Sequence, residues 1–259
     1  MLLRDKILLI CGAGPGMGRT VAVRAAREGA HVALMARTQA TLENTAAIVA
    51  NEGAAALCIS ADATDPAAVR GAVDQVLERF GRLDILIHSL LPPHLLKRVL
   101  ALADADLPEW KRSIEISIFG ALVMAREAAR PMVDAGRGSL VFVTATSAFQ
   151  GYPGVSAHAA GKAGIHSLAQ CLASELGPSG VRVNSVAVGV IGGQTHELPP
   201  DMDDQMRADI GYAIDTSRVA LRRNPSETEV ADAVMFLASD ASSGITGQIL
   251  TVDGGRFFR

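Results

Sequence analysis

The sequence predicts an α/β fold: a doubly wound, seven-stranded parallel sheet with helices on both faces, in a single domain of residues 1–259. Three observations lead to this prediction. Short apolar runs alternate with helical patterns along the chain, and most of these runs are apolar throughout, as in strands buried on both faces. A glycine-rich turn also joins the first run directly to a helical pattern. Right-handed crossovers then place a ligand crevice at the carboxyl ends of the strands.

Seven strands and six helical segments alternate in the expected order. The strands are expected at Lys6–Cys11, Val32–Ala36, Ala55–Ser60, Asp84–His88, Ser139–Thr144, Val181–Ala187 and Ile249–Val252. The helices are expected at Gly18–Glu28, Thr41–Glu52, Ala67–Phe80, Glu109–Asp134, Ala157–Leu176 and Thr228–Ala238.

The composition narrows the class of protein. The chain has 49% hydrophobic residues and a net charge of −3, which argues against disorder and against a nucleic-acid partner. The first residues are too few and too charged for a signal peptide, and no apolar run reaches membrane-spanning length. Three scattered cysteines in apolar patterns are typical of small buried residues in a reducing compartment. We expect a cytoplasmic protein that does not bind membranes.

The glycine-rich turn predicts a phosphate site. Gly12, Gly16 and Gly18 follow the spacing Gly-x-x-x-Gly-x-Gly, with Gly14 and Met17 between them. Glycines let the backbone approach a bound group closely, and the N–H groups at a helix N-terminus favour an anion. The alternative is a turn with a structural role only. The strand–turn–helix context favours a nucleotide phosphate.

The whole chain resembles the short-chain dehydrogenase/reductase family, in the glycine turn and in four further motifs. These motifs are Asp62-Ala63-Thr64, Asp84-Ile85-Leu86-Ile87, Val183-Asn184-Ser185-Val186, and Gly244-Ile245-Thr246-Gly247-Gln248 with Val252-Asp253-Gly254-Gly255. The resemblance implies a Rossmann-like fold and a nicotinamide dinucleotide as cofactor. It places Asp62 and Ala63 beside the adenine, and Gly189 and Ile191 at the nicotinamide.

The end of the second strand bears on the choice of cofactor. An acidic residue there would accept hydrogen bonds from the ribose 2′-OH and repel a 2′-phosphate. Ala36 and Arg37 stand at that position instead, and a guanidinium can hold a phosphate in a fork. The alternative is that Arg37 is a solvated residue at a helix start. We expect NADP(H) to be preferred over NAD(H).

The catalytic positions depart from the family pattern. Enzymes of this family usually carry a Ser at the end of the fifth strand, a Tyr-x-x-x-Lys pair in the next helix and an Asn in the preceding helix. In this chain those positions hold Ala145, His158 with Lys162, and Ser117, so that only the Lys remains. The resemblance implies that Lys162 binds the nicotinamide ribose and assists a proton transfer.

His158 predicts different proton chemistry from a phenol. An imidazole starts near pKa ~6.5, and the neighbouring ammonium of Lys162 should lower that pKa further. A mostly neutral His158 suits a general base better than a general acid. The alternative is a histidine that only packs or hydrogen-bonds within its helix.

Several hydroxyls near the fifth strand could replace the missing Ser. The candidates are Thr144, Thr146, Ser147 and Tyr152, and Thr146 is favoured because it directly follows Ala145. Each of them could equally satisfy local backbone groups. The six histidines show no metal-ligand spacing, and we expect no metal site.

Two further segments bear on the substrate and on assembly. Residues 192–215 are polar and contain methionines, which predicts a substrate lid, although its acidic residues could form only a solvated face. The helices at Glu109–Asp134 and Ala157–Leu176 are apolar on all sides, so we expect a homo-oligomer, a dimer or a tetramer.

Three functions remain open at this point. The first is an NADP(H)-dependent oxidoreductase of a small or medium apolar carbonyl or alcohol, with His158 and Lys162 in place of the Tyr–Lys pair. The second is a non-redox isomerase, dehydratase or lyase that uses His158 as its base. The third is a nucleotide-binding pseudoenzyme or partner subunit.

Overall fold

The protein is built on one parallel sheet of seven strands in the order β3-β2-β1-β4-β5-β6-β7. The computed structural model describes residues 1–91, 106–151, 155–192 and 215–258. The strands are β1 (Ile7–Cys11), β2 (His31–Ala36), β3 (Ala56–Ser60), β4 (Ile85–His88), β5 (Gly138–Ala145), β6 (Val181–Val188) and β7 (Ile249–Val252). Every strand boundary lies within one residue of its predicted position. The predicted Rossmann-like, doubly wound, single-domain fold is confirmed.

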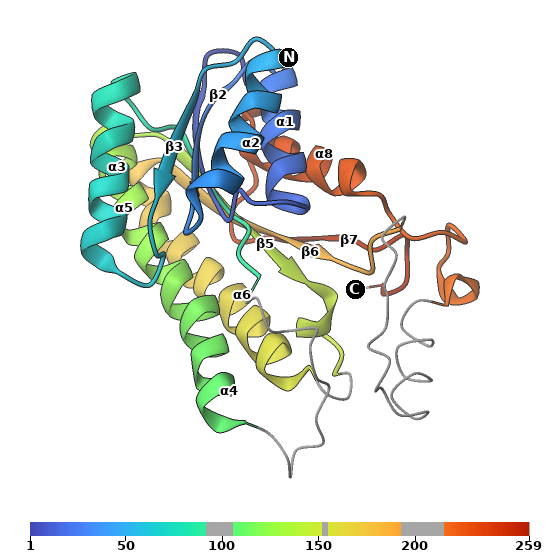
Figure 1. Ribbon diagram of the computed structural model, residues 1–259. Helices are drawn as coiled ribbons and strands as arrows, with labels where there is room; N and C mark the ends of the chain where they lie inside the picture. Colours follow the sequence, from blue (N-terminus) through green and yellow to red (C-terminus); the bar gives the residue numbers. More distant parts are fainter. Residues whose placement is uncertain (92–105, 152–154, 193–214, 259) are drawn as a thin grey trace.

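Helices cover both faces of the sheet (Figure 1). The helices are α1 (Met17–Arg27), α2 (Gln39–Asn51), α3 (Pro66–Phe80), α4 (Leu107–Ile114), α5 (Gly120–Asp134), α6 (Ser156–Leu176) and α8 (Glu227–Ala238). One face packs against α1, α2 and α8, and the other against α3, α5 and α6. Each face forms its own apolar core, which explains why the strands are apolar on both sides. No helix in the described ranges is long and apolar enough to cross a membrane.

One predicted helix is interrupted. The pattern Glu109–Asp134 predicts a single helix, but the structure has α4, a π-helical turn at Glu115–Phe119, and then α5. The prediction was wrong in this respect because packing on α6 decides the path. A Cβ on Gly161 of α6 would lie 2.9 Å from Ser117 Oγ, and one on Gly164 would lie 2.5 Å from Ile118 Cδ1. Two glycines on α6 therefore receive two side chains of the π-turn.

The strand order reverses at β1, which lies between β2 and β4. Cys11, the last residue of β1, pairs with Met35 on one side and with His88 on the other. In an open α/β sheet, a ligand binds outside the carboxyl ends of the strands at this kind of switch point.

Candidate active site

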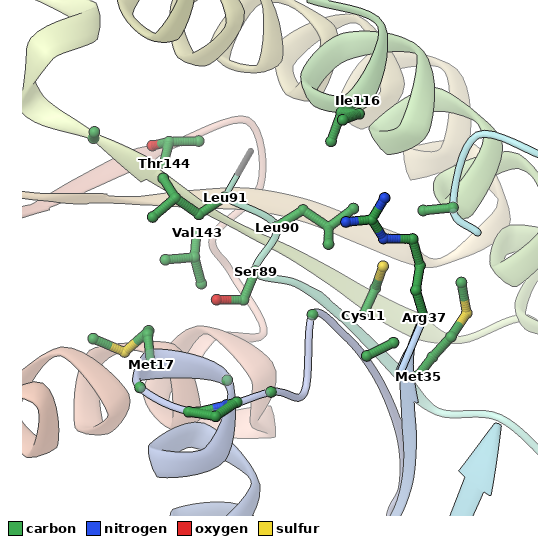
Figure 2. A pocket seen from close by; sticks show the side chains of 18 of the residues that line it. Cys11, Met17, Met35, Arg37, Ser89, Leu90, Leu91, Ile116, Val143 and Thr144 are labelled. Atoms are coloured by element: carbon green, nitrogen blue, oxygen red, sulfur yellow. The ribbon is translucent and has the colours of Figure 1, made fainter. Parts of the chain in front are cut away.

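A pocket of about 630 Å³ lies at the carboxyl ends of the strands (Figure 2). This volume is within the range of small-molecule and cofactor sites. Every residue predicted to bind the cofactor lines it: Gly12, Gly14, Gly16, Met17, Gly18, Arg37, Asp62, Ala63, Lys162, Gly189 and Ile191. The fold thus brings these residues together from five separate segments of the chain.

The glycine turn has a shape that side chains would destroy. Gly12 and Gly16 both have a φ of 87°, in the left-handed region that favours glycine. A Cβ on Gly12 would lie 2.4 Å from the carbonyl oxygen of Ser89, and a Cβ on Gly18 would lie 1.9 Å from the carbonyl oxygen of Gly12. A Cβ on Gly14 would meet nothing within 4 Å. The backbone of the turn therefore requires glycine at positions 12, 16 and 18, but not at position 14.

The turn leads into a helix end that suits an anion. Helix α1 begins at Met17 without a side-chain cap and without an acidic residue in its first turn. Its first N–H groups and the positive end of its dipole are therefore not neutralised by a carboxylate within the helix. This cradle fits the pyrophosphate of a dinucleotide.

The far end of the pocket is defined by Arg37 and Asp62. Arg37 extends from the end of β2 over the pocket (Figure 2). Asp62 accepts hydrogen bonds from the N–H and Oγ1 of Thr64, at 2.8 and 2.7 Å. Burial acts to raise the pKa of Asp62, but these hydrogen bonds and the charges of Arg112 and Arg37 hold it below its usual value.

Arg112 is a pocket residue that sequence reasoning missed. It lies on α4 and forms an ion pair with Asp62 at 3.4 Å and with Glu115 at 2.8 Å. Asp62 lies at the end of β3, about fifty positions earlier in the chain. The contact depends on how α4 crosses the sheet, so no local sequence signal could have identified it.

Lys162 lies at the opposite end of the pocket. It is 4% exposed, and its Nζ donates to the carbonyl oxygens of Leu90 and Val143, both at 3.0 Å. An ammonium has three N–H donors, so one donor is left for a ligand. Burial lowers the pKa of Lys162 to about 8. The charge of Lys162 therefore becomes partial in mildly alkaline solution.

His158 lines the pocket four residues before Lys162 on α6. It is 8% exposed, and its Nδ1 is buried without a hydrogen-bond partner. Its Nε2 is not among the sealed atoms without a partner. Burial lowers the pKa of His158 to about 3, and the charge of Lys162 acts in the same direction. The ring is thus neutral at physiological pH.

The other two catalytic candidates do not line the pocket. Ser117 is 1% exposed, and its Oγ is buried without a partner against Gly161. Thr146 is 6% exposed in a 3-10 turn after β5. The pocket is lined instead by their neighbours Ile116 and Ala145.

Comparison with known proteins places this site in a family. A family model described as enoyl-(acyl carrier protein) reductase matches residues 12–256. L-rhamnose 1-dehydrogenase (NAD(P)(+)) of Sphingomonas sp. (strain SKA58) is 33% identical over 260 residues, covering 99% of this chain and 98% of that protein. The chain belongs to the short-chain dehydrogenase/reductase family. By class, it is an oxidoreductase.

Solved structures of this family agree with the fold. The structure of NAD+-bound xylitol dehydrogenase is 27% identical, with a TM-score of 0.89 over 98% of this chain and all of that chain. Carveol dehydrogenase from Mycobacterium avium, in complex with NAD, is 27% identical, with a TM-score of 0.87 over 98% of each chain. These two short-chain dehydrogenases each hold a nicotinamide cofactor, which supports such a cofactor for this fold.

Of the two threonines beside Ala145, Thr144 is the one that lines the pocket of this short-chain dehydrogenase/reductase. It lines the pocket at the end of β5, and its Oγ1 lies 2.6 Å from Nε2 of His166 and 3.2 Å from the carbonyl oxygen of Val186. The predicted first choice was its second neighbour, Thr146. Because successive strand residues point to opposite faces, only the structure could show that Thr144 faces α6.

A second histidine lies behind the site. His88 ends β4, is fully buried, and has no partner for either ring nitrogen. Burial lowers the pKa of His88 to about 3, and the charge of Lys162 also lowers it. Its ring packs edge-on against Phe142 at 5.8 Å. His88 is not among the described residues that line the pocket.

Proposed function

We propose that the protein is an NADP(H)-preferring oxidoreductase of a small or medium apolar alcohol or carbonyl compound, in which His158 and Lys162 replace the Tyr–Lys pair. The observation that carries the proposal is the charge of the pocket. Its described charged residues are three cations, Arg37, Arg112 and Lys162, and one carboxylate, Asp62. A pocket with this imbalance favours a polyanionic ligand.

The position of Arg37 supports NADP(H) over NAD(H). Arg37 stands at the end of β2, where a carboxylate would bind the ribose 2′-OH. Among the described residues that line the pocket, the only carboxylate is Asp62, which lies just after β3 and is already bound to Thr64 and Arg112. An exposed guanidinium at this point can form a bidentate pair with a 2′-phosphate.

The other residues have distinct tasks in this proposal. The glycine turn and the start of α1 hold the pyrophosphate, Asp62 and Ala63 flank the adenine, and Gly189 and Ile191 face the nicotinamide. When bound, the cofactor supplies or accepts a hydride. Lys162 uses its third N–H donor to bind a ribose hydroxyl, and its buried charge polarises the catalytic end.

The substrate class follows from the side chains around His158. The pocket there is lined by aliphatic residues: Leu90, Leu91, Ile116, Val188 and Ile191. This lining favours an apolar ring or chain attached to the reacting carbon. The predicted lid, residues 192–215, lies outside the described residues except at its two ends. It remains part of the proposal.

Assembly and location are also proposed. Exposed apolar side chains of α4, the π-turn and α5 support a homo-oligomer: Trp110, Phe119, Leu122 and Val133. All three cysteines are free, which fits a reducing, cytoplasmic compartment. Cys11 is buried, but Cys58 is only half-buried and Cys171 is exposed, so the expectation of three buried thiols was wrong.

Thermal unfolding tests the cofactor proposal. A ligand at about 100 times its Kd adds ~2.7 kcal/mol, which should raise the Tm of a chain of this size by roughly 5–10 °C. We expect NADPH to raise the Tm more than NADH at equal concentration. Arg37→Ala should weaken NADPH binding by roughly tenfold or more and leave NADH binding nearly unchanged. Equal shifts with both nucleotides would contradict the preference.

A substrate screen then tests the activity. L-rhamnose, cyclopentanol and xylitol, named for relatives, represent polar and apolar alcohols. We expect NADPH formation with cyclic apolar alcohols to exceed that with sugars. If no nucleotide shifts the Tm, the non-redox function with His158 as base becomes the stronger candidate. Normal nucleotide binding without turnover would favour the pseudoenzyme instead.

A further inference from the structure

The two ring nitrogens of His158 lie in different surroundings. Nδ1 is sealed from solvent and has no partner, whereas Nε2 is not sealed in this way and the residue lines the pocket. A neutral imidazole carries one proton, and the surroundings of each nitrogen determine where it sits. A proton on Nε2 makes the ring a hydrogen-bond donor to the pocket. A proton on Nδ1 leaves a lone pair facing the pocket and makes the ring a base.

A second unpartnered group lies on the same side of α6. Ser117 Oγ is buried, lacks a partner, and would be 2.9 Å from a Cβ on Gly161. Residues three apart on a helix are neighbours, with Cβ atoms about 5–6 Å apart. His158 and Gly161 have this spacing. Ser117 Oγ therefore contacts α6 about one helical turn away from His158.

The needs of the two groups are complementary. A hydroxyl of Ser117 could have donated to a backbone carbonyl of its own helix, as serines within helices often do. No such bond forms, so its O–H still requires an acceptor. The lone pair of an unprotonated Nδ1 is an acceptor, whereas an Nδ1–H would add a second buried donor. Buried donors without partners are rarer in proteins than buried acceptors without partners.

The positive end of α6 and the ammonium of Lys162 both keep the His158 ring neutral. His158 is the third residue of α6, whose first turn has no acidic residue and no side-chain cap. The positive helix end and the ammonium of Lys162 both oppose a second proton on the ring. The only described carboxylate that lines the pocket, Asp62, is paired with Arg112.

We propose that Ser117, through one buried water, holds His158 as the neutral Nε2–H tautomer, so that His158 donates a hydrogen bond to the substrate oxygen. His158 is then a catalytic residue that donates a hydrogen bond to the carbonyl or alkoxide oxygen and keeps its own proton. On oxidation the alcohol O–H proton passes to solvent water in the pocket as the hydride passes to the cofactor, and Ser117 is a positioning residue. A neutral histidine has this electrophilic role in triosephosphate isomerase. The substrate contact rests on the proposed function; the tautomer does not.

The tautomer is measured by 15N NMR of histidine-labelled protein without cofactor, with His158→Gln to assign the signals. A protonated ring nitrogen gives a pyrrole-type resonance and an unprotonated one a pyridine-type resonance. We expect Nε2 to be pyrrole-type and Nδ1 pyridine-type at pH 7, with no titration down to about pH 4. A pyrrole-type Nδ1, or a titration near pH 6.5, overturns the proposal.

Two serine variants isolate the positioning role. Ser117→Ala should shift the Nδ1 resonance and increase the share of the Nδ1–H form, and Ser117→Cys should have a smaller effect. Ser185→Ala is the matched control, because it removes another buried, unpartnered hydroxyl from β6. If Ser117→Ala and Ser185→Ala give identical His158 spectra, Ser117 has no positioning role. The spectra are informative whether or not NADPH binds, so this test fails separately from the proposed function.

Discussion

The two ends of the pocket are built in different ways. At the phosphate and adenine end, backbone geometry does most of the work, and Asp62 is fully engaged by Thr64 and Arg112. At the catalytic end, His88, Ser117 and His158 carry buried polar atoms without partners. Buried polar groups normally find partners, because an unpaired one costs about 1–3 kcal/mol.

The first end depends on the backbone, and the second depends on side chains. A diphosphate needs only N–H groups and a close backbone, so glycines at fixed spacing provide the site. Substrate chemistry depends on whether each side chain carries a proton. Here burial and the charge of Lys162 lower the pKa values of His88 and His158, so both rings are neutral at physiological pH.

The largest expected effect comes from removing the one cation of the catalytic end. Lys162→Ala should lower turnover by at least about a hundredfold, the lower bound for a group that assists proton transfer. It should also weaken NADPH binding, because the third N–H donor of Lys162 is lost. The measurement is turnover on the alcohol identified by the screen, with the Kd of NADPH from a fluorescence titration.

His158→Ala, measured in the same way, tests whether the two ends of the pocket act independently. It should lower turnover but leave the Kd of NADPH within about twofold, because the proposed function places His158 against the substrate and not the nucleotide. Full activity in His158→Ala would remove His158 from the mechanism. A large loss of NADPH affinity in that variant would show that the two ends are not independent.

The next largest effect concerns the backbone of the phosphate end. Gly18→Ala places a Cβ 1.9 Å from the carbonyl oxygen of Gly12, so the start of α1 must move. We expect a loss of about 2 kcal/mol in the free energy of unfolding in urea, with much weaker NADPH binding. Gly14→Ala is the control, because its Cβ meets nothing within 4 Å and should change stability by less than about 0.5 kcal/mol. Equal effects of the two variants would refute this account of the turn.

The last effect appears only below neutral pH and is the acid sensitivity that His88 gives to the fold. Its pKa is about 3 in the folded protein and near 6.5 when unfolded, so between these values only the unfolded chain binds the proton. Stability should therefore fall as the pH drops from 6.5 towards 3, by about 1.4 kcal/mol per pH unit from this residue. His88→Leu should reduce that slope, measured by urea unfolding at pH 7, 6, 5 and 4.

A non-titrating variant of the same region controls for packing. Ser185→Ala changes a buried polar side chain on β6, which pairs with Phe142 of β5, but adds or removes no proton. It should shift stability equally at every pH. If His88→Leu also gives a constant shift, the linkage assigned to His88 is wrong.

Much of the fold could be predicted because its signals are local. Apolar runs gave the strands to within one residue, and the glycine spacing identified the turn at Gly12–Gly18. The interruption at Glu115–Phe119 could not be predicted, because it depends on Gly161 and Gly164 of another helix. Local periodicity describes one helix at a time and carries no information about which neighbour it meets.

The sequence by itself determined the family, the sheet, the residues proposed to bind the cofactor, and the presence of His158 beside Lys162. Only the tertiary structure decided that Arg112 reaches Asp62, that Thr144 and not Thr146 lines the pocket, and that Ser117 is sealed against α6. It also decided that Nδ1 of His158 is sealed from solvent. The physical reason is that a residue type fixes which groups are available, whereas burial and long-range packing fix which of them are paired, charged or open.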